Sequence, residues 1–140
     1  MLDLLHLAAK YAALKHDDDR VFLLGAVGVR NDGRLVHAQN SSVLDTLKHV
    51  DWAKKYVYKR FPESHAEVRL TRKLGFGATV YVARVTRNDG GLAMARPCEC
   101  CQHVLKAFRV KRVYYSINNF EWGVWDPKKN IDMHYSKSGK

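Results

Sequence analysis

Two short stretches of the chain carry the residue types that could do chemistry. One holds His65 and Glu67, and the other, further along, holds Cys98 and Cys101 directly after a proline. An imidazole and two thiolates are ligands that zinc prefers, and a catalytic zinc site characteristically takes three protein ligands and leaves a fourth position to water. Glu67 lies close enough to His65 in the chain to move protons to and from that water. The two stretches together predict a zinc site with His65, Cys98 and Cys101 as ligands.

The spacing of the cysteines supports this prediction. Cys98 and Cys101 are three residues apart, which is about one turn of helix, so both sulfurs can face one point. At a helix start, the unpaired N–H groups and the dipole favour thiolate over thiol. A zinc ion held there lowers the pKa of its bound water from about 15.7 to about 7–9. Cys100 lies between the two ligands and is expected to point away from them, as a small buried side chain.

A structural zinc site or a redox pair remains an alternative for the Cys-x-x-Cys stretch alone. A structural site would need a fourth protein ligand, for which Cys100, His103 and His134 are the candidates. The presence of Glu67 beside His65 favours catalysis instead.

Length and cysteine usage narrow the class of protein. The 140 residues suit one domain, and 46% of them are hydrophobic, which is enough for a sizeable core. All three cysteines fall within residues 98–101, where they cannot cross-link distant segments, so a reducing compartment such as the cytoplasm is expected. No apolar run approaches the roughly 18 residues of a membrane span, and no basic segment precedes an apolar run at the start. Neither a membrane partner nor secretion is expected.

The formal net charge is +10, with basic residues dispersed along the chain. Such a balance favours polyanions or phosphorylated small molecules as partners, although a solvated basic surface would give the same composition.

The pattern of apolar residues and breakers predicts the elements that position the motifs. Helices are expected at 3–16, 65–74 and 98–108, and strands at 21–29, 35–39, 78–85, 112–116 and 120–125. Residues 42–64 are read as a short helix and a loop at the rim of the site, and the polar stretch 127–140 is expected to fray. This order predicts an α/β protein, a three-layer α/β/α sandwich with a mixed five-stranded sheet. The short link 117–119 favours an antiparallel last strand.

His65-Ala66-Glu67 and Pro97-Cys98-Glu99-Cys100-Cys101 resemble the motifs of the cytidine and deoxycytidylate deaminase superfamily, which also holds tRNA adenosine deaminases and editors of single-stranded DNA and RNA. The resemblance covers about residues 20–117, the core of a single domain spanning 1–140. It implies the sandwich fold, a Zn²⁺ cofactor and Glu67 as the catalytic proton shuttle.

The resemblance also implies substrate contacts. Asn40 would contact the substrate sugar, and the backbone amide of Ala66 would meet the pyrimidine carbonyl. Arg96 departs from the serine or glutamate that editors of polynucleotides and tRNA usually carry before the Pro-Cys pair. Its forked donors could hold a substrate phosphate, or it could be a solvated charge.

The expected function is therefore the deamination of a cytosine base in a free nucleoside or nucleotide, and the chain resembles compact phage-type deoxycytidylate deaminases. One alternative is deamination of cytosine or adenine in single-stranded DNA or tRNA, which the net charge and the aromatic residues at 52, 56, 58 and 61 beside lysines would suit. A second is a non-catalytic zinc-containing domain that binds nucleic acid. Relatives commonly build part of the site across a subunit contact, which leaves a homo-oligomer open.

Overall fold

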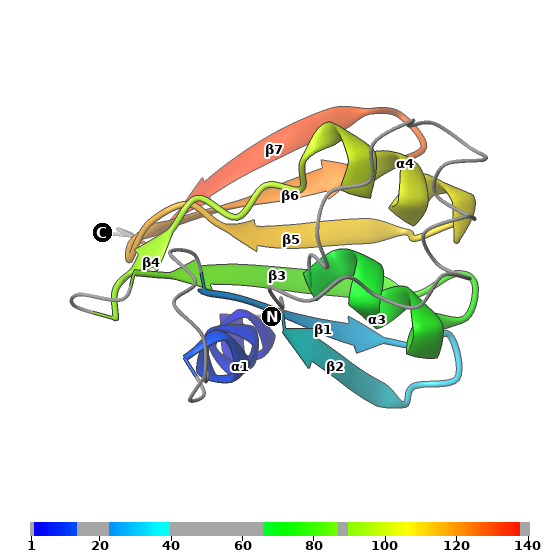
Figure 1. Ribbon diagram of the computed structural model, residues 1–140. Coiled ribbons are helices and arrows are strands. Elements are labelled where there is room, and N and C mark those ends of the chain that lie inside the picture. Colours follow the sequence, from blue (N-terminus) through cyan, green and yellow to red (C-terminus); the bar gives the residue numbers. More distant parts are fainter. Residues whose placement is uncertain (1, 14–22, 40–65, 87–89, 138–140) are drawn as a thin grey trace.

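The computed structural model describes residues 2–13, 23–39, 66–86 and 90–137. Within them the helices are α1 (Leu2–Ala12), α3 (Ala66–Leu74) and α4 (Glu99–Ala107). The strands are β1 (Leu23–Val29), β2 (Leu35–Gln39), β3 (Thr79–Val85), β4 (Leu92–Ala93), β5 (Arg112–Ser116), β6 (Glu121–Asp126) and β7 (Ile131–Ser136), as Figure 1 shows. None of the helices in the described residues is long and apolar enough to cross a membrane.

The strands form one mixed sheet in the order β2-β1-β3-β5-β6-β7, with the short β4 paired to the end of β3. β3 and β5 run parallel, and the other neighbouring strands run antiparallel. The predicted mixed sheet is confirmed, and so is the antiparallel hairpin after the short link at 117–119.

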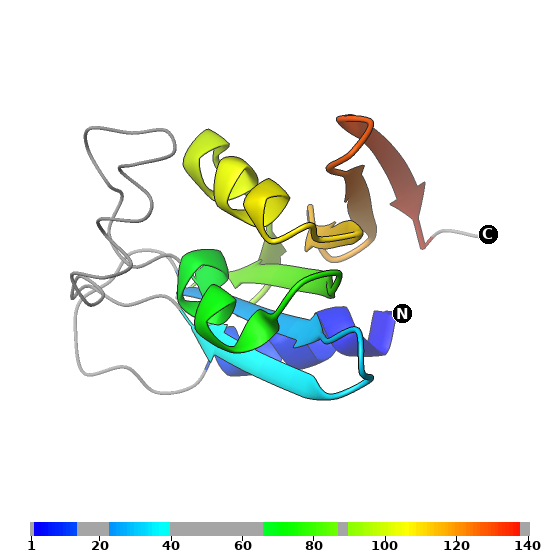
Figure 2. The ribbon, with the colours of Figure 1, turned by 90° about the vertical axis from the view of Figure 1, so that its right-hand side faces the viewer.

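Side chains that alternate along the central strands build a separate apolar layer on each face of the sheet. On one face, Ala26, Val80 and Val82 pack in a cluster with buried leucines of α3 and α4. On the other face, Val27 and Tyr81 pack with buried residues of α1. The predicted three-layer sandwich is confirmed, with α1 on one side of the sheet and the other two helices on the opposite side (Figure 2).

A glycine on β1 sets how closely α1 lies on the sheet. A Cβ atom added at Gly25 would overlap the carbonyl oxygen of Ala8 and lie 2.6 Å from the backbone nitrogen of Ala12. Since both contacts are to backbone, no side-chain rearrangement could relieve them. Gly25 therefore permits the helix backbone to approach the strand directly.

Several predicted boundaries agree with the structure. The strand at 35–39 and the end of the helix before Gly75 match, and Gly75 and Gly77 adopt the positive φ angles, 69° and 78°, that glycine allows at a helix end. The predicted first helix extends to residue 16, whereas α1 ends at Ala12; residues 14–22 lie outside the described residues. The short helix and loop expected in 42–64 also lie outside them.

Two expectations for the sheet are wrong. Among the described residues the sheet has seven strands rather than five, and residues 131–136 of the stretch expected to fray form β7, which pairs with β6 over its whole length. The Asp126 carboxylate accepts hydrogen bonds from the backbone N–H groups of Lys128 and Lys129, at 3.0 and 3.2 Å, and so builds the turn into β7. Ile131, Met133 and Tyr135 alternate with polar residues along β7, but all six side chains of this edge strand are exposed, so the alternation marks no buried face, and the polar composition of the stretch suggested fraying instead. β4 has only two residues, too few for a periodic signal.

Candidate metal centre

The residues predicted to do chemistry lie at the N-terminal ends of two neighbouring helices. Ala66 is the first residue of α3, and Glu67 lies in its first turn. Cys98 is the residue that precedes α4 at its N-cap position, with extended φ and ψ angles of −68° and 167°, and Cys101 lies in the first turn. The two helices contact each other on the same face of the sheet (Figure 1). Their unpaired N–H groups make both ends favourable for negative charge.

Backbone contacts fix the start of α4. The carbonyl oxygen of Cys98 accepts a hydrogen bond from the backbone N–H of Gln102, and the Gln102 side-chain amide donates to the carbonyl of Pro97, both at 2.8 Å. This glutamine therefore holds the Pro97–Cys98 segment against the first turn. Because Pro97 lacks an N–H and has a fixed φ, the chain enters the helix in one defined direction.

Cys98, Cys101 and Glu67 form one electrostatic cluster. Cys101 is fully buried and Glu67 is only 3% exposed, whereas Cys98 reaches the surface. A hydrogen bond with the Cys98 side chain, burial and the negative charge of Glu67 together raise the pKa of the Cys101 thiol well above its usual value. The ionised forms of all three groups are negative, so they repel one another and disfavour the Cys101 thiolate. A divalent cation between the sulfurs would attract these charges and favour the thiolates. Two sulfur donors at a helix start, the buried Cys101 and the exposed Cys98, fit zinc.

His65, the expected third ligand, immediately precedes α3 in the chain but lies outside the described residues. Among the residues that the structure does describe, no group of three or more histidine, cysteine, aspartate and glutamate side chains is placed to hold a metal ion. The ligand set of His65, Cys98 and Cys101 therefore stays a prediction. Asn40 also lies outside the described residues, and the substrate contact of the buried Ala66 likewise stays a prediction.

Cys100 is buried, as expected from its place between the two predicted ligands. Burial first, and then the neighbouring Cys98, raises the pKa of its thiol to about 11, so it remains protonated at neutral pH. His134 lies on β7, where its Nε2 atom is 3.0 Å from the Glu121 carboxylate.

Arg96, two residues before Cys98, takes part in a contact that the sequence did not indicate. Its Nε and Nη2 atoms donate to the two carboxylate oxygens of Asp132, at 3.0 and 2.8 Å. The Tyr115 hydroxyl donates to the same carboxylate at 2.8 Å. Asp132 and Tyr115 were missed because they are distant in sequence and Asp132 falls in the stretch expected to fray. The phosphate contact expected of Arg96 stays a prediction, since here its two donors are directed at Asp132.

The sequence and the fold are similar to those of known deaminases. The family model described as "Cytidine and deoxycytidylate deaminase zinc-binding region" matches residues 2–117. A cytidine deaminase structure from Mycobacterium leprae is 19% identical, with a TM-score of 0.56, over 91% of this chain and 92% of that one. The cytidine deaminase of Mycobacterium tuberculosis is 18% identical, with a TM-score of 0.50, over 84% and 89%. At these identities the structures show the fold alone. A search of curated proteins by sequence finds no match.

Proposed function

The chain belongs to the family of cytidine and deoxycytidylate deaminases that share this zinc-binding region, and from this premise we propose that it deaminates the cytosine base of a free nucleoside or nucleotide. Membership of the family indicates a zinc-dependent deaminase, and the proposal adds that its substrate is a free nucleoside or nucleotide. The solved structures that share this fold are cytidine deaminases, and the proposal carries the free substrate over from the activity that their names state.

The observation that carries the catalytic part of the proposal is the position of Glu67. Its carboxylate is buried at the start of α3, close enough to Cys101 for its charge to raise the pKa of that thiol. Burial keeps bulk water away from the carboxylate and so preserves its strength as a proton acceptor. A proton shuttle needs this placement, beside the metal ligands without being one of them.

In the proposed reaction, the oxygen of a water molecule bonds to the ring carbon that carries the exocyclic amine, and the carbon–nitrogen bond then breaks. Zinc, when held by His65, Cys98 and Cys101, supplies the acidification of that water. Glu67 accepts the two protons of the water in turn, and delivers the first to the ring nitrogen and the second to the departing amine, which leaves as ammonia. The product is the corresponding uracil compound.

The substrate contacts proposed for this site come from the chain around it. The backbone N–H of Ala66, at the start of α3, would bind the pyrimidine carbonyl, and Asn40 would bind the sugar. Arg96 would bind a substrate phosphate. To do so it would exchange its hydrogen bonds to Asp132 for hydrogen bonds to the phosphate, because a carboxylate and a phosphate accept the same paired donors. A monophosphate substrate would then be preferred over its nucleoside.

The test is ammonia release by the zinc-loaded protein from cytidine, deoxycytidine, deoxycytidylate and a cytosine-containing oligonucleotide. We expect turnover of a free cytosine compound, and a loss of at least about 10²-fold in rate in Glu67→Gln at unchanged zinc content. Glu99→Gln is the matched control, because Glu99 is exposed and lies in the first turn of the other helix. Release from the oligonucleotide alone would instead establish an editor of polynucleotides. Normal turnover by zinc-loaded Glu67→Gln would remove Glu67 from the mechanism.

A further inference from the structure

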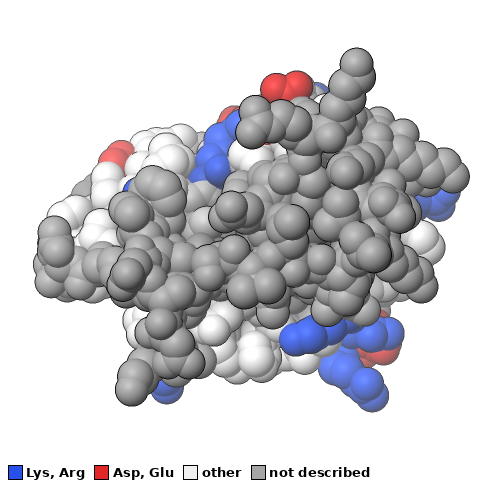
Figure 3. Space-filling model, in the orientation of Figure 1, with Lys and Arg blue, Asp and Glu red and all other residues white. Residues whose placement is uncertain are grey.

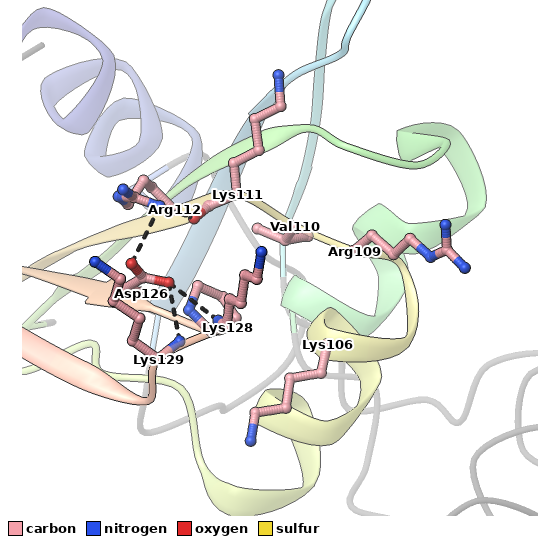
Figure 4. Close-up of a pocket in the computed structure, with 9 residues that line it drawn as sticks. Lys106, Arg109, Val110, Lys111, Arg112, Asp126, Lys128 and Lys129 are labelled. Atoms are coloured by element: carbon pink, nitrogen blue, oxygen red, sulfur yellow. Dashed lines mark hydrogen bonds and ion pairs between the residues drawn. The ribbon is translucent and has the colours of Figure 1, made fainter.

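A hollow of about 640 Å³ lies at the C-terminal end of α4, away from Cys98. Basic side chains surround it, and we call it the basic hollow: Lys106, Arg109, Lys111, Arg112, Lys128 and Lys129. They come from α4, from the link between α4 and β5, from the start of β5 and from the turn between β6 and β7, and Figure 4 shows the head groups of Arg109 and Lys111 directed outward. Since α4 has nine residues, it separates the hollow from Cys98 by about 13 Å at 1.5 Å per residue.

The sheet register brings these cations together from segments that are remote in sequence. Val113 on β5 pairs with Trp125 on β6, which places Arg112 beside Asp126 where these two strands start and end. Asp126 in turn pairs with Ile131 across the turn. The fold therefore gathers six positive charges at one place, even though like charges repel.

Little negative charge offsets these cations. Asp126 is the acidic residue that lines the hollow, and it is 6% exposed. Its carboxylate holds the backbone N–H groups of Lys128 and Lys129 and lies 3.4 Å from the Arg112 guanidinium (Figure 4). The aspartate thus fixes the turn that presents the two lysines. A basic residue such as Lys106 in the last turn of α4 complements the helix dipole, but that explanation does not extend to the cations on β5 and in the turn.

An exposed aromatic ring contacts the segment that leads from α4 into the lining of the basic hollow. Phe76 is 66% exposed, and its ring centroid is 5.8 Å from that of Phe108, the residue before Arg109. The Gly77 N–H donates to the Phe108 carbonyl at 3.2 Å, which ties the two segments together. An exposed ring beside a basic surface is suited to stack with an unpaired base, whereas the bases of a duplex are already stacked on one another.

Further basic residues continue from the hollow toward the β1–β2 hairpin. The Lys111 ammonium donates to the Asn31 side chain at 3.2 Å, and the Arg30 guanidinium donates to the Lys73 carbonyl at 3.1 Å. Figure 3 shows Lys and Arg side chains gathered where this hairpin ends the sheet, with an acidic side chain among them, and the Arg30 guanidinium lies 3.5 Å from the Asp32 carboxylate. A flexible polyanion could therefore contact cations over a longer track than one small phosphate compound would occupy.

We propose that the basic hollow and Phe76 form an accessory surface that binds single-stranded nucleic acid, with lysines and arginines on the phosphates and the phenylalanine on a base. The surface lies apart from the zinc site and needs no reactive base. It is therefore independent of the substrate proposed above.

The experiment measures binding of a fluorescent oligothymidylate by anisotropy between 50 and 200 mM salt, with the zinc-loaded full chain. Thymine carries no exocyclic amine, so the readout does not depend on deamination. If four of the six cations contact phosphates, log affinity should fall against log salt with a slope of about −2.8, since each contact contributes about −0.7. The Lys128→Gln, Lys129→Gln double variant should reduce this slope by about 1.4. Phe76→Ala should weaken binding by about fivefold or more.

The matched control is the Lys10→Gln, Lys137→Gln double variant, which removes the same charge from two exposed lysines elsewhere. Its slope should equal that of the unmodified chain. Lys106→Gln, on α4, provides a second variant that leaves the turn intact and should reduce the slope by about 0.7. Absence of binding at 50 mM salt, or equal slopes in the turn and control variants, would overturn the proposal. Equal affinity for a duplex, with no effect of Phe76→Ala, would overturn the assignment to single strands.

Discussion

At the scale of single residues, the three cysteines near the start of α4 occupy different environments. Cys98 is exposed at the N-cap, whereas Cys100 and Cys101 are buried. No disulfide joins any of the three, all of which the structure describes. The side chains of Cys98 and Cys101, the two predicted zinc ligands, are hydrogen-bonded to each other, and this contact distinguishes them from Cys100.

We predict that the cysteine variants differ in how much zinc they retain. The unmodified chain and Cys100→Ala should each hold about one zinc per chain, while Cys98→Ala and Cys101→Ala should lose most of it, because a three-ligand site with one thiolate removed binds zinc poorly. Elemental analysis after dialysis measures this, and circular dichroism checks that each variant folds. Loss of zinc from Cys100→Ala, or retention by Cys101→Ala, would show that the ligand set is different.

A second prediction at this scale concerns Asp132. Hydrogen bonds from Arg96 lower the pKa of Asp132 below 3.8 in the folded state. The resulting stability is present above the unfolded pKa and is lost as pH falls through the folded value. Both side chains are about one-third exposed (36%), so solvent screening limits the contribution to about 1 kcal/mol or less. Asp132→Asn should lower the free energy of unfolding by this amount at pH 7, and the difference should shrink below pH 3.8.

Urea unfolding of both proteins at pH 7, 5 and 3 measures the Asp132 effect. An equal difference at all three values would mean that packing, rather than the charge of Asp132, is responsible. The same contact shows a limit of sequence reasoning. Glu67, Cys98 and Cys101 follow from short-range motifs, whereas Arg96 meets Asp132 across 36 residues, through a strand in the stretch that was expected to fray.

At the scale of elements, glycines on β1 set the distance to both neighbouring layers. Gly25 faces the backbone of α1, whereas a Cβ at Gly28 would meet the side chains of Leu74, Val36 and Leu70. Side chains can shift to make room, but the backbone of a packed helix cannot do so cheaply. The two residues thus provide a matched pair of positions on one strand.

We predict that Gly25→Ala destabilises the protein more than Gly28→Ala does. An alanine at 25 must displace α1, at a cost of about 3 kcal/mol or more, whereas overpacking against the leucine and valine side chains should cost about 1–3 kcal/mol. Thermal unfolding followed by circular dichroism compares the two variants. A Gly25→Ala protein as stable as the unmodified chain would show that α1 does not pack on β1 as closely as the structure indicates.

Elements with a strong local sequence pattern could be predicted, whereas elements held mainly by pairing with a neighbouring strand could not. Buried residues at helical spacing and two glycines located α3, and the Asn31–Gly33 turn located the β1–β2 hairpin. β7 is exposed along its length and is held by backbone pairing with β6 and by the Asp126 turn. The strand order also depends on contacts between remote segments, so spacing along the chain does not determine it.

At the scale of the whole molecule, the charge of +10 is distributed unevenly. Six cations surround the basic hollow, and Asp126 is the acidic residue among its lining side chains. Such a cluster destabilises the folded state through repulsion, and repulsion between exposed charges weakens as salt shortens the Debye length. Retaining clustered charge at a cost in stability is expected of a binding surface, because functional sites are not optimised for stability.

This argument predicts that salt stabilises the protein and that the turn lysines are responsible for part of the effect. Raising sodium chloride from 20 to 200 mM should raise the melting temperature of the unmodified chain, since the Debye length falls from about 20 Å to about 7 Å. The Lys128→Gln, Lys129→Gln variant should be more stable than the unmodified chain at 20 mM salt, by a few tenths of a kcal/mol for each charge removed, or about 0.5 kcal/mol in all. At 200 mM the two proteins should melt at similar temperatures.

The control is the Lys10→Gln, Lys137→Gln variant, whose stability at 20 mM should rise less, because neither lysine lines the hollow. If the turn variant instead melts lower at both salt concentrations, Lys128 and Lys129 stabilise the β6–β7 turn and do not contribute to a repulsive cluster.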